Sequence, residues 1–191
     1  FRERWGLSES DKLVLSVGLR IPRKGVDTFV NVSSKFKDRK DVKFAWVGAS
    51  EALLKDALDQ TSRGNVMFPG HVPFEEIVGV YSAADVFVFP TRAESYGNAM
   101  LEAASCGCPL LIRDIPVYEE WVHDGEHCLK AKDDEDFSKK LSTIIDDDGL
   151  RRKLVDGAGQ LASEHDIRKT ALMLKELYES LSAGGESARS T

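Results

Sequence analysis

The sequence predicts an α/β fold: a Rossmann-like, doubly wound parallel sheet of about six strands, with helices on both faces and extra helices at the carboxyl end. Short apolar runs rich in β-branched and aromatic residues alternate with longer segments of helical period, which is the pattern of repeated strand–helix units. Several runs, such as DVFVFP and PLLIRD, are apolar at nearly every position. Strands of that kind are buried on both faces, as they are in a parallel sheet.

The apolar runs place the strands, and the stretches of helical period between them place the helices. The expected strands are residues 13–17, 42–47, 66–68, 86–89, 109–112 and, with the weakest pattern, 128–131. The expected helices between them are residues 26–36, 50–60, 74–83, 98–105 and 117–122. From residue 133 to 181 the pattern is helical, with breaks near Gly149 and at 164–166. We therefore expect one domain over residues 1–181, followed by a disordered tail at 182–191.

Length and composition narrow the class of protein. With 191 residues, 42% of them hydrophobic, the chain suffices for one domain with a sizeable core. Its formal net charge of -6 argues against a nucleic-acid partner, because binding to phosphate backbones needs a basic face. The three cysteines form no paired metal-ligand spacing, which favours a reducing, cytoplasmic setting over a disulfide framework. No apolar run approaches the roughly 18 residues that span a bilayer, and no signal peptide is visible.

Three loops at one edge of the expected sheet carry unusual chemistry. In an open parallel sheet, ligands bind beyond the carboxyl ends of the strands, where loops lead into helix N-termini. The loop after the first strand, GLRIPRKG, holds Gly18, Arg20, Arg23 and Lys24. The loop after the third strand is FPGHVP, and the segment after the fourth is FPTRAESYGNAMLEAASCGCP. We expect the function to reside in these loops.

The segment after the fourth strand predicts a site for a phosphate. A helix that begins near Asn98 directs its first, unpaired amides and the positive end of its dipole outward. Gly97, just before it, lets a ligand approach the backbone. Glu94 lies on one side of this helix end, and Glu102 lies about one turn further along the helix, roughly 6 Å away.

A nucleotide sugar would suit this arrangement, because it has a diphosphate in its middle and a diol at each end. An ionised carboxylate can accept hydrogen bonds from two neighbouring hydroxyls, and the basic residues of the first loop would supply the countercharge. Other interpretations stay open: TRAE, residues 91–94, fits a capping box, Glu102 could be an ordinary exposed helix residue, and the basic loop could be a solvated turn. The coincidence of all these features at one sheet edge favours the nucleotide-sugar site.

The motifs of the chain also resemble a known family. The runs VLSVGLRIPRKGVDTFV, FAWVGAS, NVMFPGHVPFEEIVGVYSAADVFVFPTRAESYGNAMLEAASCGCPLL and VYEEWVHDGEHC occur in this order and resemble the carboxyl-terminal, donor-binding domain of retaining GT-B glycosyltransferases of family 4. The resemblance covers roughly residues 1–180 and implies one half of a GT-B fold. The segments GLRIPRKG and RDIPVYEEW are more similar to the bacterial glycolipid branch, which glycosylates diacylglycerol-type lipids.

The resemblance implies roles for individual residues. Glu94 would contact hydroxyls of the donor hexose, and Glu102 those of the ribose. Lys24 would neutralise phosphate, and the His71–Val72 loop would lie against the base. The expected donor-binding residues are Gly18, Arg20, Arg23, Lys24, His71, Val72, Glu94, Ser95, Tyr96, Gly97, Asn98, Ala99 and Glu102, and the expected catalytic residues are Glu94 and Lys24.

One departure from the family pattern affects the phosphate assignment. The family usually has an arginine directly after the first-strand glycine, and this chain has Leu19 there. Arg20 or Arg23 would have to substitute for that arginine.

The implied function is transfer of a hexose, with retention of anomeric configuration, from a nucleoside diphosphate sugar, expected to be a UDP sugar, to an acceptor. Lys24, a neighbouring arginine and the helix end would stabilise the diphosphate as charge develops on it, with no metal and no cofactor. The acceptor site would lie on an amino-terminal domain outside these residues, which begin at Phe1 rather than methionine. This piece alone should then bind donor but turn over little or nothing. Membrane contact, if the protein is peripheral on the inner face of the plasma membrane, would belong to that missing domain.

Two alternatives to a glycosyltransferase stay open. One is a nucleotide-sugar-binding module without catalysis, and the other is a different GT-B enzyme such as a sugar-nucleotide epimerase or a phosphorylase. A dinucleotide-dependent dehydrogenase is disfavoured, because neither Gly18 nor Gly48 begins the three-glycine run that such enzymes carry.

The remaining groups of reactive residues are expected to be structural. The acidic runs DDED and IDDDG lie at expected helix ends, where carboxylates interact favourably with the backbone. Cys106 and Cys108 are expected to be small packing residues rather than nucleophiles, and Trp46 and Trp121 to pack in or near the core. The four histidines form no ligand set, and His71 is the only one expected near the site.

Overall fold

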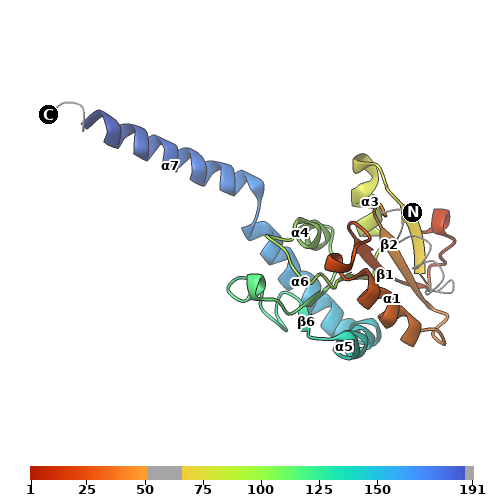
Figure 1. Cartoon of the computed structure of the whole chain (residues 1–191). Coiled ribbons are helices and arrows are strands. Elements are labelled where there is room, and N and C mark those ends of the chain that lie inside the picture. Colours follow the sequence, from red (N-terminus) through yellow and green to blue (C-terminus); the bar gives the residue numbers. More distant parts are fainter. Residues whose placement is uncertain (51–65, 188–191) are drawn as a thin grey trace.

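The computed structural model describes residues 1–50 and 66–187 and contains a six-stranded parallel sheet (Figure 1). All five pairs of neighbouring strands run parallel. The predicted fold class is therefore confirmed, and each predicted strand is present within two residues of its expected bounds. The strands are β1 (Lys12–Val17), β2 (Val42–Val47), β3 (Val66–Gly70), β4 (Val86–Phe89), β5 (Leu110–Arg113) and β6 (Leu129–Ala131).

The strand order is β3-β2-β1-β4-β5-β6, so the chain winds away from β1 in one direction and, from β4 onward, in the other. The reversal lies between β1 and β4, where Val14 pairs with Val86 and Leu15 with Phe87. At such a reversal, the loops that follow two adjacent strands turn to opposite faces of the sheet and leave a crevice between them. These are the loops that carry the predicted basic cluster and the predicted glutamates.

Helices cover both faces of the sheet. Successive strand residues point to opposite faces, so Leu13 and Leu15 pack on one side while Val14 packs on the other. This two-sided burial is the reason that β4 reads VFVF without a polar residue. The first face is covered by α3 (Ile77–Ser82), α4 (Asn98–Ser105) and much of α6 (Asp148–Glu164), and the second by α1 (Val26–Lys35) and α5 (Asp134–Asp146).

An aromatic group fixes α1 on the second face. The ring of Phe29 meets those of Phe44 and Trp46 edge to face, with centroids 5.6 and 5.3 Å apart, the geometry that aromatic quadrupoles favour. The indole Nε1 of Trp46 donates a hydrogen bond to the carbonyl of Gly18 at 2.8 Å. Trp46 is thus a core residue, as predicted, and its polar atom also holds the first residue after β1.

One predicted helix is absent from the structure, and another lies almost wholly outside the described residues. The α-helix predicted at 117–122 is wrong: the chain forms only a 3-10 turn, Pro116–Tyr118, followed by further turns. Six residues close too few backbone hydrogen bonds to offset the cost of helix nucleation, and burial of Tyr118 and Val122 fixes the turns instead. The helix predicted at 50–60 lies, apart from Ser50, outside the described residues.

The carboxyl-terminal part is helical, as predicted, with breaks close to the expected places. Asp133 caps α5 by accepting a hydrogen bond from Asp136 N, and Asp147 caps α6 by accepting one from Leu150 N, both at 2.9 Å. The acidic runs therefore act at helix ends, as expected.

The last helix, α7 (Ile167–Ser187), projects away from the rest of the chain (Figure 1). All side chains from Ile167 to Leu181 are exposed, including those of Leu174 and Leu177. The helix ends six residues beyond the predicted helical limit at 181, so only 188–191 of the predicted tail lie outside the described residues. Within the described part of the chain, no helix combines the length and apolar character needed to cross a bilayer.

A pair of glycine substitutions tests the contact between the loops after β1 and β4. Gly25 has a φ of +77° and lies so close to Pro90 that an added Cβ would overlap the Pro90 carbonyl. Gly107 has a similar φ of +78° but has open space around it. We expect Gly25→Ala to lower the free energy of unfolding by about 3 kcal/mol, the sum of backbone strain and overpacking. Gly107→Ala should cost only the strain, about 1 kcal/mol. Urea unfolding measures both, and equal losses would contradict the close contact.

Candidate functional site

The loops that follow β1 and β4 are joined by hydrogen bonds at the carboxyl edge of the sheet. The amide of Arg92 donates to the carbonyl of Arg23 at 2.8 Å, and the Arg23 guanidinium donates back to the carbonyl of Ala93 at 2.8 Å. These reciprocal bonds bring together two segments that are far apart in sequence. Arg23 therefore helps to hold the loops together.

An ion pair lies across the two loops. Lys24 Nζ donates a hydrogen bond to Glu94 Oε1, and the two side chains are only 19% and 9% exposed. Thr91 Oγ1 donates a second hydrogen bond to the same oxygen at 3.0 Å. No helix begins at Thr91, so the alternative interpretation of residues 91–94 as a helix capping box does not hold. Glu94 instead accepts hydrogen bonds from both loops.

The N-terminus of α4 lies beside this ion pair. The helix begins at Asn98, as predicted, and no side chain caps it, so its first amides keep the positive end of the dipole open to a ligand. Gly97, in the left-handed region at φ +97°, is packed so that an added Cβ would lie 2.5 Å from the hydroxyl of Tyr118. A hollow of about 200 Å³ opens here, lined by Lys24, Phe89, Glu94, Ser95, Tyr96, Gly97, Asn98 and Ala99.

Glu102 lies one turn along α4 and has a different partner. Its Oε2 accepts a hydrogen bond from the hydroxyl of Tyr81 at 2.8 Å. Tyr81 belongs to α3 and is buried; burial and the negative charge of Glu102 both raise its pKa, so the phenol stays protonated and donates. One carboxylate oxygen of Glu102, Oε2, is fixed by this bond. The other oxygen accepts no hydrogen bond from the residues that the structure describes.

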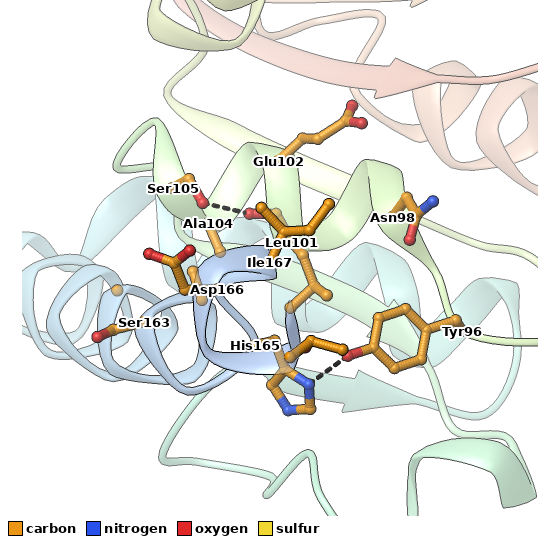
Figure 2. Close-up of a pocket in the computed structure, with 13 residues that line it drawn as sticks. Tyr96, Asn98, Leu101, Glu102, Ala104, Ser105, Ser163, His165, Asp166 and Ile167 are labelled. Carbon is orange, nitrogen blue, oxygen red and sulfur yellow. Dashed lines mark hydrogen bonds between the residues drawn. The ribbon is translucent and has the colours of Figure 1, made fainter. Parts of the chain in front are cut away.

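The two glutamates do not line one cavity. Glu102 borders a second hollow of about 720 Å³ between α4 and the α6–α7 junction. Figure 2 shows Glu102 pointing away from His165 and Asp166, which lie on the other side of this hollow. The hollow at Glu94 and the hollow at Glu102 share Tyr96 and Asn98 in their walls. The Glu94 carboxylate is therefore held at the loop after β1, whereas the Glu102 carboxylate is turned toward Tyr81 on α3, and the two share no cavity.

Three of the remaining predicted residues, His71, Val72 and Gly18, border a third hollow, and Arg20 is buried. His71 and Val72 border an apolar hollow of about 370 Å³ together with Gly18 and Leu19. Leu19, at the position where the resemblance implies an arginine, is 52% exposed. Arg20 is only 5% exposed, and its guanidinium lies 4.8 Å from the ring centre of Phe68 on β3. Of the three predicted cations, Lys24 is the one that lines the hollow at the α4 N-terminus.

Sequence reasoning missed several residues around the site. It did not anticipate Tyr81 as the partner of Glu102. It placed only His71 among the histidines near the site, whereas His165 contacts Tyr96, one of the predicted donor-binding residues. A hydrogen bond joins His165 to the hydroxyl of Tyr96 (Figure 2). His165 also lies against Trp121, with ring centroids 4.5 Å apart. Tyr96 and His165 are 69 residues apart in sequence, so no local pattern could have paired them.

The other reactive residues do not assemble a reactive centre. Among residues 1–50 and 66–187, no three His, Cys, Asp or Glu side chains gather closely enough to hold a metal ion. Cys108 and Cys128 are fully buried, and Cys106 is half-buried. The view of Cys106 and Cys108 as packing residues agrees with this burial.

Thiol labelling tests that view of the cysteines. Burial raises the pKa of the Cys108 thiol to about 12 and that of Cys128 to about 12, so neither forms thiolate at pH 8. We expect iodoacetamide to leave both unmodified in the folded chain and to modify both in urea, as mass spectrometry would show. Rapid native labelling of Cys108 at pH 8 would contradict its assignment as an inert packing residue.

Comparison with known proteins identifies relatives of the whole chain. The chain is 29% identical over 184 residues to a processive diacylglycerol alpha-glucosyltransferase of Acholeplasma laidlawii, a match that covers 94% of this chain and 54% of that protein. It is 24% identical over 187 residues to the alpha-galactosylglucosyldiacylglycerol synthase of Streptococcus pneumoniae, covering 94% of this chain and 49% of that protein. The chain thus spans about half the length of these relatives. Both names refer to diacylglycerol, in agreement with the glycolipid branch that the sequence resembles.

Solved structures agree with the fold. The structure of Anabaena HepE in complex with UDP and glucose matches with a TM-score of 0.83 at 20% identity, covering 94% of this chain and 51% of that one. Sucrose-phosphate synthase from Thermosynechococcus elongatus matches with a TM-score of 0.84 at 24% identity, covering 96% and 48%. The family model described as Glycosyl transferases group 1 matches residues 1–160, which confirms the predicted resemblance at the level of the family. The chain therefore belongs to the glycosyl transferases group 1 family.

Proposed function

We propose that this chain binds the nucleoside diphosphate sugar, a UDP sugar, from which a glycosyltransferase transfers a hexose with retention of configuration and without a metal ion or a cofactor. The observation that carries the proposal is the Lys24–Glu94 ion pair beside the uncapped N-terminus of α4. The pair offers a cation to a phosphate and a carboxylate to sugar hydroxyls, and the helix offers its amides to the same anion.

Binding would exchange one set of partners for another. The diphosphate would take Lys24 from Glu94, and hydroxyls of the hexose would replace the ammonium as donors to the Glu94 carboxylate. Both side chains are largely shielded from water, so each must find a new partner at once, because an unpaired buried charge is costly. A ligand that carries both groups at the right separation satisfies this condition.

The nucleoside would lie on the side of α4 that carries the Glu102 carboxylate, toward the hollow at His71 and Val72. Glu102, oriented by Tyr81, has one oxygen left to accept hydrogen bonds from the ribose diol. The apolar hollow at His71 and Val72 suits the flat face of a base. The preference for UDP is supported by the fold shared with HepE, whose structure holds UDP and glucose.

Catalysis at this end would be electrostatic. As the bond to the sugar breaks, negative charge accumulates on the diphosphate, and Lys24 with the amides of Asn98 and Ala99 would stabilise it. Because the chain spans about half of its relatives, we propose that the acceptor site lies on an amino-terminal half, so that this chain alone binds donor with little turnover. Any peripheral contact with the inner face of a plasma membrane would also belong to that half.

Calorimetric titration of the chain with UDP-glucose, UDP-galactose and GDP-mannose tests donor binding. We expect one UDP sugar to bind, and Lys24→Met and Glu102→Gln each to weaken it tenfold or more, since a hydrogen bond to a charged group contributes about 1.5–3 kcal/mol. Lys175→Met and Glu176→Gln, on the exposed helix α7, are matched controls and should leave the affinity unchanged. Absence of binding by the unaltered chain, or equal affinity in all five proteins, would overturn the proposal.

The exchange at Lys24 predicts a contrast between UDP and the UDP sugar. In Glu94→Gln, we expect the affinity for the UDP sugar to fall about tenfold, because a charge-assisted acceptor for the hexose is lost. The affinity for UDP alone should stay the same or rise, because no carboxylate then competes for Lys24. The same titrations measure both values, and a parallel fall for the two ligands would show that Glu94 does not face the sugar.

A further inference from the structure

Three aromatic rings from distant parts of the chain meet beside the α4 N-terminus. Tyr96 stacks on Trp121, with ring centroids 5.3 Å apart and planes 17° from parallel. His165 lies against both, 4.5 Å from the Trp121 ring and 5.6 Å from the Tyr96 ring. A hydrogen bond joins the Tyr96 hydroxyl to His165 Nδ1, as the dashed line in Figure 2 marks.

Tyr96 lies where its orientation affects both glutamate hollows. Its side chain lines the hollow at Glu94 and the hollow at Glu102. It directly precedes Gly97, whose backbone packs on Tyr118, and α4 begins one residue later. A different position of the Tyr96 ring would therefore change the walls of both hollows directly beside the first amides of α4.

Burial alone does not fix the Tyr96 ring, because the residue is 42% exposed. An exposed aromatic side chain samples several rotamers unless specific contacts hold it. Stacking on Trp121 restrains the plane of the ring but allows it to slide. The hydrogen bond at the hydroxyl restrains its far end, and the two contacts together leave one position.

His165 is held by a rigid element. It is the C-cap of α6, and its amide donates to the carbonyl of Leu161 at 3.3 Å. Leu161 and Ala158 are fully buried against the first face of the sheet. The imidazole is thus anchored through α6 to the core, while the segment that it contacts is a loop without regular structure.

We propose that His165 is a positioning residue for the donor site: its hydrogen bond to Tyr96 holds the segment from Glu94 to Gly97 in the conformation that receives the donor. The inference rests on the proposed function and adds a residue that lies outside the matched motifs. His165 does not need to touch the donor. It acts by removing alternative positions of Tyr96, which would otherwise lower the apparent affinity in proportion to their population.

The experiment combines single and double substitutions with titration of the full chain by the UDP sugar that the unaltered chain binds. We expect His165→Ala and Tyr96→Phe each to weaken binding about fivefold, and the double variant to be no weaker than either one, because both remove the same bond. His165→Asn should restore affinity to within about twofold, since its amide can place a hydrogen-bonding atom near Nδ1. His123→Ala, which alters a histidine paired with His127 rather than Tyr96, is the matched control.

The outcomes separate this inference from the proposed function. If the unaltered chain binds none of the sugars, the proposed function fails and the inference falls with it. If the unaltered chain binds but His165→Ala binds equally well, only the inference is overturned. Additive losses in the double variant would mean that the Tyr96 hydroxyl contacts the donor directly, which also overturns it. Should His165→Ala fail to fold by circular dichroism, comparison of Tyr96→Phe with Tyr96→Phe/His165→Asn decides: equal affinities support the inference, and a further loss contradicts it.

Discussion

The site depends on the close contact between the loops that follow β1 and β4. The sheet order makes these strands neighbours, and the absence of a side chain at Gly25 lets the first loop pack directly on the carbonyl of Pro90. Only at this separation can Lys24 of one loop reach Glu94 of the other. A bulkier residue at position 25 would push the loops apart and break the ion pair without touching either of its members.

The Lys24–Glu94 pair has an energetic cost that the proposed function would explain. Two charges shielded from water gain less from each other than they lose in hydration unless the geometry is favourable. The pair receives additional support from Thr91, which donates to the same oxygen, and from the dipole of α4 nearby. Such a pair is stable enough to keep the loops ordered, yet each member retains the capacity to accept a better partner. An anionic ligand with hydroxyl groups is a partner for both.

Sequence patterns were sufficient for the sheet because two-sided burial leaves a strong local signal. Runs such as VFVF in β4 have no other stable environment in a chain of this size. The start of α4 at Asn98 was equally local, since Gly97 interrupts any earlier helix. The helix predicted at 117–122 is absent, because burial of Tyr118 against the core determines the backbone conformation there, and the helical spacing of apolar residues does not. For the candidate site, the sequence could indicate which loops lie at the carboxyl edge of the sheet but not how their side chains are paired. Whether Arg20 faces a ligand or the ring of Phe68, and which side chain orients Glu102, depends on contacts between segments that share no sequence pattern.

Helix α7 has a consequence for how the chain exchanges its amide hydrogens with solvent. Its 21 residues extend for about 30 Å, and every side chain from Ile167 to Leu181 is exposed. The helix is therefore supported mainly by its own backbone bonds and by local pairs such as Lys175–Glu179, a combination that is marginal in water at this length. Amides in β1 and β4 open only when the whole core does. Amide exchange rates should therefore differ on the two sides of His165. Core amides before it exchange only on global unfolding, whereas amides of α7 exchange whenever that helix frays.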